Sequence, residues 1–85
     1  MPKREVIADN RPTNGAQLQR LRFIDAILYH YGYLNRAVIM DFFGLSTPQV
    51  SLDIAAYIAA APNNLIYNES ARHYECTTEF ARVFE

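Results

Sequence analysis

A very short junction between two helical segments constrains this chain more than any other feature. Residues 36–43 have the length and the apolar side of a helix, and Gly44 suits the left-handed conformation that ends one. Only Gly44 and Leu45 separate this segment from a second helix start at Ser46. Because so short a connection forces two helices to cross sharply, the sequence predicts a helix-turn-helix unit.

Two further signals define the two helices that come before this junction. Asn14 can cap a first helix over residues 15–31, which Gly32 ends. Its apolar residues recur every three or four positions, a spacing that places them on one face. These residues are Leu18, Leu21, Ile24, Leu28 and Tyr31. Asn35 is the capping candidate for the helix over 36–43.

The helix after the junction has the clearest start signal in the chain. Ser46 is a cap, Pro48 lies in the first turn, and Gln49 occupies the capping-box position. Pro62 disfavours a helical Ala61, so the predicted helix spans 46–61. Its expected core stripe consists of Val50, Ile54, Tyr57, Ile58 and Ala61.

The pattern then changes from a helical period to alternation. Two runs, at 65–68 and 73–77, alternate apolar and polar residues around a short loop at 69–72, as a β-hairpin does. Four residues are expected on the inner face of this hairpin: Leu65, Tyr67, Tyr74 and Cys76. Phe80, Val83 and Phe84 are spaced to pack a short terminal turn onto the core.

The predicted fold is therefore mainly α with a small β-hairpin: a winged helix-turn-helix of three helices and a two-stranded wing. At 85 residues the chain is one small domain. Residues 1–13 contain Pro2 and Pro12 and no helical period, so they are expected to form a flexible N-terminal arm before a domain over 14–85.

Several function classes find no support in the sequence. His30 and His73 lie on different elements and have no metal-ligand spacing near them, and two histidines with one cysteine, Cys76, make a weak ligand set, so no metal site is expected. Cys76 is expected to be a small buried apolar residue rather than a nucleophile. The glycines form no phosphate-binding loop and no acid pair suggests acid–base catalysis, so neither an enzyme nor a cofactor is predicted. No apolar run approaches the length of a membrane span.

The start of the helix over 46–61 is the strongest candidate for a binding surface. Its first turns offer the short polar side chains Ser46, Thr47, Gln49 and Ser51. In a helix-turn-helix unit these positions meet base edges in the major groove, and glutamine can bind adenine through two hydrogen bonds. The alternative is that Ser46 and Gln49 only cap the helix. Ser46 can do both, and the two roles of Gln49 are left open.

Arginines near this unit are candidates for phosphate contacts. Arg36 begins the second helix, and Arg72 follows Ser70 near the tip of the wing. Each of the two arginines could instead be an ordinary solvated side chain. Arg20 and Arg22 lie on the first helix and could face either DNA or a partner. Charge is uneven along the chain, with net +3 over residues 1–24 and net −4 over residues 25–85.

Two features of the helix over 46–61 speak against simple DNA binding. Asp53 is expected to point away from the core stripe, where it would repel phosphate, as would Asp41 and Glu69. In addition, four apolar residues are expected opposite the core stripe: Leu52, Ala55, Ala56 and Ala59. This face could pack against another domain, a second subunit or the first helix. A winged helix that contacts protein without binding DNA directly is therefore the alternative function.

Specific segments resemble a known family. They are Arg20–Asp25 (RLRFID), Gly32–Arg36 (GYLNR), Phe42–Asp53 (FFGLSTPQVSLD) and Pro62–Tyr67 (PNNLIY), with Tyr57, His73-Tyr74 and Thr78-Glu79-Phe80. The likeness is to the N-terminal winged-helix domain of WYL-domain transcriptional regulators that repress bacterial phage-defence operons. It covers about residues 17–84. The segment FFGLSTPQVSLDI alone is moderately specific, because winged-helix regulators of the DeoR type share its outline. The P-x-N-L-x-Y segment makes the likeness to the WYL-domain regulators more specific.

The resemblance implies sequence-specific binding of double-stranded DNA, as the reading domain of a bacterial repressor. The matching positions are Ser46 to Ser51 in the recognition helix and Ser70 to Arg72 in the wing. Two copies are expected to read a palindromic operator as a homodimer. A cytoplasmic location is expected from this role and from a start without a signal-peptide pattern, and no small-molecule ligand is expected on this domain. Family members continue into a ligand-sensing and a dimerisation domain, so the chain is expected to be either an excised domain or a stand-alone version.

Overall fold

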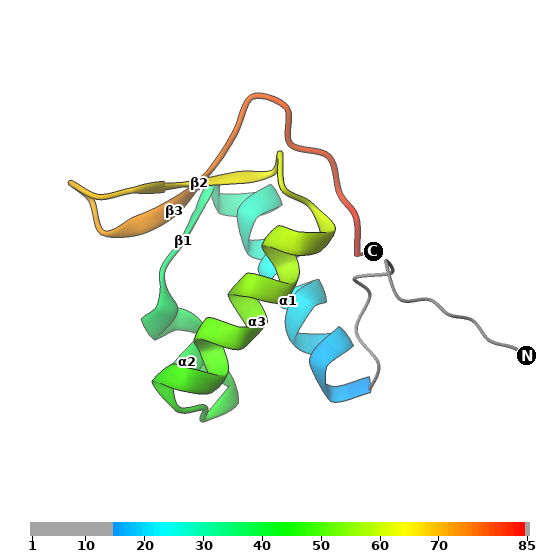
Figure 1. Ribbon diagram of the computed structural model, residues 1–85, viewed down its shortest axis with the longest axis vertical. Coiled ribbons are helices and arrows are strands. Elements are labelled where there is room, and N and C mark those ends of the chain that lie inside the picture. Colours follow the sequence, from blue (N-terminus) through cyan, green and yellow to red (C-terminus); the bar gives the residue numbers. More distant parts are fainter. Residues whose placement is uncertain (1–14, 85) are drawn as a thin grey trace, which may run out of the picture.

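The computed structural model describes residues 15–84 and confirms the winged helix fold. The predicted arm over 1–13, the cap at Asn14 and the last residue, Glu85, lie outside this described range. The elements are α1 (Gly15–Tyr31), β1 (Tyr33–Leu34), α2 (Arg36–Phe43), α3 (Thr47–Ala60), β2 (Leu65–Asn68) and β3 (His73–Cys76). In Figure 1 the helices pack together below the sheet, and the wing extends to one side.

Local capping signals place the helix ends where the sequence predicts them. The Asn35 side chain accepts a hydrogen bond from the backbone N–H of Val38 at 3.0 Å and so begins α2. Gly44 ends α2 with φ 68°, a left-handed conformation that most residues avoid. The Ser46 hydroxyl accepts from the Gln49 N–H at 3.4 Å and begins α3.

A third strand joins the predicted hairpin. The sheet order is β1-β3-β2, and both pairings are antiparallel. The hairpin register matches the prediction, with Leu65 opposite Cys76 and Tyr67 opposite Tyr74. The two residues of β1 follow the αL residue Gly32 (φ 82°) directly. Because two residues are too few to show alternation, the sequence pattern gave no sign of β1.

The core lies between the three helices and the inner face of the sheet. Its fully buried apolar residues are Leu21, Ile24 and Leu28 from α1, Ile39 from α2, and Val50 and Tyr57 from α3. Leu34, Leu65 and Phe84 close it from the sheet and the C-terminal segment. Burial of each such side chain contributes about 1.5–3 kcal/mol of transfer free energy.

Some residues predicted for the core are exposed instead. Tyr31 is 70% exposed because α1 ends there and the chain turns at Gly32. Ile58 is 37% exposed, on the flank of α3. Tyr67 is 46% exposed but packs against Tyr74, with ring centroids 4.8 Å apart. The converse holds for Ala56, which is half-buried against the core rather than on the open face.

A polar cluster beneath the C-terminal segment holds residues 80–84 against α1 and α3. The fully buried Asp25 carboxylate accepts hydrogen bonds from the Tyr57 hydroxyl at 2.5 Å and from Arg82 Nε at 2.8 Å. Burial raises the pKa of Tyr57 well above its ordinary value, as does its hydrogen bond to Asp25, so the hydroxyl remains a donor. Asn64 donates to the carbonyl of Ala81 at 2.8 Å and accepts from its N–H at 3.1 Å.

The C-terminal segment begins with a short turn, in which the Phe80 N–H donates to the Thr77 carbonyl at 3.2 Å. The residues that follow have no regular structure and pass along the helices in Figure 1. Phe84 is buried and Phe80 is half-buried, as predicted, whereas Val83 is 47% exposed. No helix within residues 15–84 is both long and apolar enough to cross a membrane.

Candidate nucleic-acid interface

The junction between α2 and α3 is closed by several local hydrogen bonds. The Met40 carbonyl accepts from the N–H of Gly44 at 2.7 Å and from that of Leu45 at 3.1 Å. The Thr47 hydroxyl lies 3.7 Å from the Met40 sulfur, across the corner. These contacts hold α3 at a fixed crossing to α2, and they leave the first turn of α3 open to solvent.

The first turn of α3 places its predicted contact residues unequally. Ser46 and Thr47 are exposed, whereas Gln49 and Ser51 are half-buried. The capping box is only half formed, because the Gln49 side chain does not reach back to Ser46. Instead, Gln49 Nε2 donates to Asp53 Oδ1 at 3.2 Å, one turn further along the helix. One of the two amide N–H donors of Gln49 is thus engaged within α3, whereas the second N–H and the amide oxygen remain available to a ligand.

Asp53 corrects the sequence analysis most clearly. The prediction placed it on the outer face of α3, but its side chain is fully buried. Arg20 from α1 donates to it twice, from Nε at 2.5 Å and from Nη2 at 3.2 Å. Asp53 shares the i, i+3, i+4 stripe of Val50, Ile54 and Tyr57, so the helical period itself places it inward. The ion pair with Arg20 makes the burial of this carboxylate tolerable.

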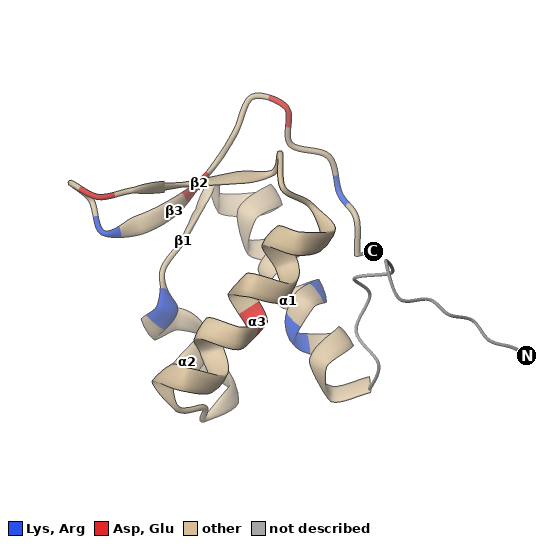
Figure 2. Ribbon diagram, viewed as in Figure 1, with Lys and Arg blue, Asp and Glu red and all other residues tan. Residues whose placement is uncertain are grey.

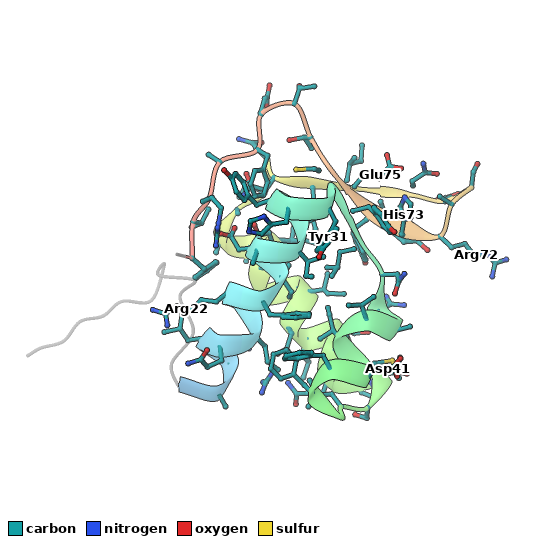
Figure 3. The ribbon with its side chains drawn as sticks, turned by 180° about the vertical axis from the view of Figure 1, so that it is seen from behind. Arg22, Tyr31, Asp41, Arg72, His73 and Glu75 are labelled. Carbon is teal, nitrogen blue, oxygen red and sulfur yellow. The ribbon has the colours of Figure 1, made fainter. Side chains whose placement is uncertain are left out.

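Two exposed arginines flank this helix pair. Arg36 is exposed at the start of α2, and Arg72 is exposed on the turn between β2 and β3. Neither forms an ion pair with another residue in the described range 15–84. Figure 2 shows the blue start of α2 and the wing turn, which carries a blue segment beside a red tip, on the same side of the molecule. Figure 3 shows Arg72 and Arg22 projecting at opposite ends.

The wing turn is ordered by Asn68. Its side chain accepts from the N–H of Ala71 at 3.0 Å, and its carbonyl accepts from the N–H of Arg72 at 2.8 Å. Arg72 has φ 59°, a left-handed conformation that costs a non-glycine residue roughly 1 kcal/mol. Ser70 is exposed within the turn, next to the exposed acidic Glu69. The predicted wing residues Ser70 and Arg72 therefore lie in a compact turn, and the charged side chain of Arg72 is exposed to solvent.

The outer face of the sheet carries a second polar cluster. His73 Nε2 lies 2.8 Å from Glu75 Oε2, which also accepts from Asn68 Nδ2 at 2.9 Å. His73 is half-buried there, and its ring lies 4.9 Å from that of Tyr33. The hydrogen bond from His73 lowers the pKa of Glu75 below its ordinary value of 4.5, and that from Asn68 adds to this shift.

This lowered pKa predicts that the wing loses stability in acid. A carboxyl whose pKa is depressed by folding stabilises the fold above its unfolded pKa, and that contribution disappears as the pH falls through the folded pKa. Wild-type protein should therefore lose more stability than Glu75→Gln as the pH falls from about 5 to about 3, the range in which carboxyl groups titrate. Urea unfolding at each pH measures this, and parallel profiles for the two proteins would contradict it.

The described residues show no arrangement typical of a metal site. No group of three or more histidine, cysteine, aspartate or glutamate side chains comes together within residues 15–84. Cys76 packs against the core as the sequence predicts, but it is half-buried rather than buried. Burial raises the pKa of its thiol, which disfavours the thiolate.

Comparisons with known proteins agree with this arrangement. The model of the BrxR transcriptional regulator winged helix-turn-helix domain matches residues 16–85. A protein of Pseudomonas aeruginosa named "DNA-binding transcriptional repressor CapW" is 46% identical, over 89% of this chain and 28% of its own length. Proteins of the same name from Escherichia coli (strain KTE188) and Stenotrophomonas maltophilia are 47% and 44% identical. They match over 80% and 79% of this chain, and over 23% and 22% of their own lengths.

The chain thus spans less than a third of the length of each of these relatives. The resemblance to the winged helix of WYL-domain regulators, drawn from the residues, is confirmed. The three helices and the small antiparallel sheet accord with a winged helix-turn-helix, and the matched model covers most of the chain. The chain belongs to the family of BrxR transcriptional regulator winged helix-turn-helix domains.

Proposed function

We propose that this chain binds double-stranded DNA as the reading domain of a bacterial transcriptional repressor. The observation that carries the proposal is the open first turn of α3, with Arg36 and Arg72 on the same side of the molecule. The names of the relatives, each a DNA-binding transcriptional repressor, support it. Such a role places the protein with the chromosome, in the cytoplasm.

In this proposal α3 enters the major groove with its N-terminal end, as recognition helices do. Hydroxyl groups there meet base edges, and the amide oxygen of Gln49 remains free to accept a hydrogen bond. Arg36 binds the phosphate backbone from the start of α2, and Arg72 grips the backbone or the minor groove from the wing. The proposed DNA contacts are Arg36, Ser46, Thr47, Gln49, Ser51, Ser70 and Arg72.

The internal pairing of Asp53 removes the main objection to this function. A carboxylate on the outer face of α3 would repel phosphate, whereas Asp53 is buried and paired with Arg20. Among the acids of the described residues, Asp25 is likewise buried and paired, with Arg82. The exposed acids Asp41, Glu69 and Glu79 remain, so we expect binding to depend on a few local contacts rather than on a strong basic field.

The whole regulator is proposed to bind as a homodimer on a palindromic operator. A single module buries only about 600–1,000 Å² of protein surface on DNA, so one copy alone binds weakly. Two copies related by a twofold axis match two half-sites, which gives the operator its inverted repeat. This domain itself needs no cofactor or small-molecule ligand for the proposed contacts.

Removing either flanking arginine is expected to weaken binding to all DNA sequences alike. We expect Arg36→Ala and Arg72→Ala each to reduce the slope of log K against log salt by about one, since each loses one phosphate contact. Fluorescence anisotropy with a mixed-sequence duplex, from low to physiological salt, measures the slope. Arg72→Lys keeps the charge and should keep the slope.

Arg22→Ala is the matched control, because Arg22 is an exposed arginine at the opposite end of the molecule from Arg72. Its slope should equal that of the wild type. Equal slopes for all the variants would remove Arg36 and Arg72 from the interface. No binding at the lowest salt would favour the second candidate, a winged helix that contacts protein, which the 62% exposure of Leu52 favours.

A further inference from the structure

The open face of α3 offers almost no side chain that can recognise a base through two hydrogen bonds. Arginine and lysine, which pair with guanine, do not occur between Thr47 and Ala60. Gln49 is the one residue of α3 whose amide can pair with adenine, and one of its two Nε2 N–H donors is already bonded to Asp53. The other strongly polar side chains of α3, Asp53 and Tyr57, are fully buried.

The exposed side chains on this face of α3 are instead mostly apolar. Leu52 lies in the second turn of α3 and is 62% exposed, and Ala55, one turn further on, is also exposed. Pro48 and the methyl group of Thr47 extend the same face toward the start of the helix. Figure 2 shows α3 coloured tan apart from the buried acidic residue. The face is therefore methyl-rich and uncharged along its first two to three turns.

One base carries an apolar group in the major groove. The C5-methyl group of thymine projects there, and alanine, threonine and other apolar side chains contact it. Resting on the DNA-reading role proposed above, we infer that Leu52, with Ala55 beside it, is a specificity-determining residue that reads thymine methyl groups. The half-site therefore carries thymine where Leu52 meets the major groove, and hydroxyl and phosphate contacts set the register.

Uracil tests this inference directly, because it differs from thymine only by lacking that methyl group. Duplexes retained by the 85-residue chain are first selected from a random library at low salt. Each thymine of the selected half-site is then replaced singly by uracil. Since a buried methyl group contributes roughly 0.8 kcal/mol, the affinity should fall about fourfold at the thymine that Leu52 contacts and little elsewhere.

Leu52→Ala identifies the residue responsible. The variant should bind the thymine duplex about fourfold or more weakly and should no longer distinguish uracil at that position. The fold should be retained, because Leu52 is exposed and alanine favours helix. Val83→Ala is the matched control: Val83 is an apolar residue of 47% exposure outside α3, and its loss should leave uracil sensitivity unchanged.

Each of the other outcomes contradicts the DNA-binding function, the contact with a thymine methyl group or the role of Leu52 in that contact. If no duplex is retained, the DNA-binding function and the inference both fail. If duplexes are retained but uracil is harmless at every position, DNA binding stands and methyl reading fails. A uracil effect that persists in Leu52→Ala removes Leu52 from the contact. Self-association that disappears in Leu52→Ala, measured by sedimentation without DNA and accompanied by unchanged uracil sensitivity, assigns this face to a second copy of the chain.

Discussion

Asp25→Ala should lower the free energy of unfolding by about 3–5 kcal/mol, as breaking a buried ion pair does. The substitution removes the acceptor for the Tyr57 hydroxyl and for Arg82 Nε. The backbone N–H groups of Val83 and Phe84, 3.3 Å and 3.2 Å from the carboxylate, lose their acceptor too. Buried donors without acceptors retain their full desolvation cost. For a domain this small, such a loss is most of the total stability.

Urea unfolding followed by circular dichroism measures the effect of Asp25→Ala. Asp25→Asn keeps the size and one acceptor oxygen, so its loss should be smaller. Asp41→Ala is the control, because Asp41 is exposed and such surface changes stay within about 0.5 kcal/mol. A loss from Asp25→Ala no larger than that of Asp41→Ala would mean that the carboxylate does not hold the C-terminal segment.

Arg20→Ala is expected to lower the free energy of unfolding by a similar amount, about 3–5 kcal/mol, because it removes the cation of a buried ion pair. Asp53 is fully buried, and Arg20 is the cation that neutralises it, with a side chain only 15% exposed. Its removal leaves an unpaired carboxylate beneath α3. Because the pair is shielded from solvent, the loss should change little between low and high salt.

A double variant separates the charge from the packing at this site. Arg20→Met combined with Asp53→Leu replaces both charges by apolar groups of similar volume, which is often neutral or stabilising. The double variant should therefore recover most of the stability that Arg20→Ala loses, in a double-mutant cycle with the single variants. If the double variant were as unstable as Arg20→Ala, the pair would matter through its shape rather than its charge.

Local sequence signals predict the helices well. Asn35, Gly44 and Ser46 each act within four residues of their own position, so the sequence alone reveals their roles. The hairpin register follows from alternation in the same way. These boundaries alone predict that Arg36, Ser46 and Thr47 lie at exposed helix starts. They also predict that Arg72 lies on an exposed turn.

Contacts between distant parts of the chain account for what the sequence did not reveal. Arg20 and Asp53 are 33 residues apart, and Asp25 lies 57 residues before Arg82. Local sequence does not identify either acid as buried, because their partners become neighbours only when the chain folds. The strand β1 is similar: its two residues become a strand only through pairing with β3.

The hydrogen bonds from Gln49 to Asp53 and from Asp53 to Arg20 have a consequence for how DNA would be met. They tie the reading end of α3 to α1, so α3 cannot roll about its own axis without breaking a buried ion pair. The surface is therefore preorganised: its side chains and helices lose their freedom during folding rather than during association. A reader of this kind should discriminate between sequences by rigid fit, and mismatched DNA would have to deform to meet it.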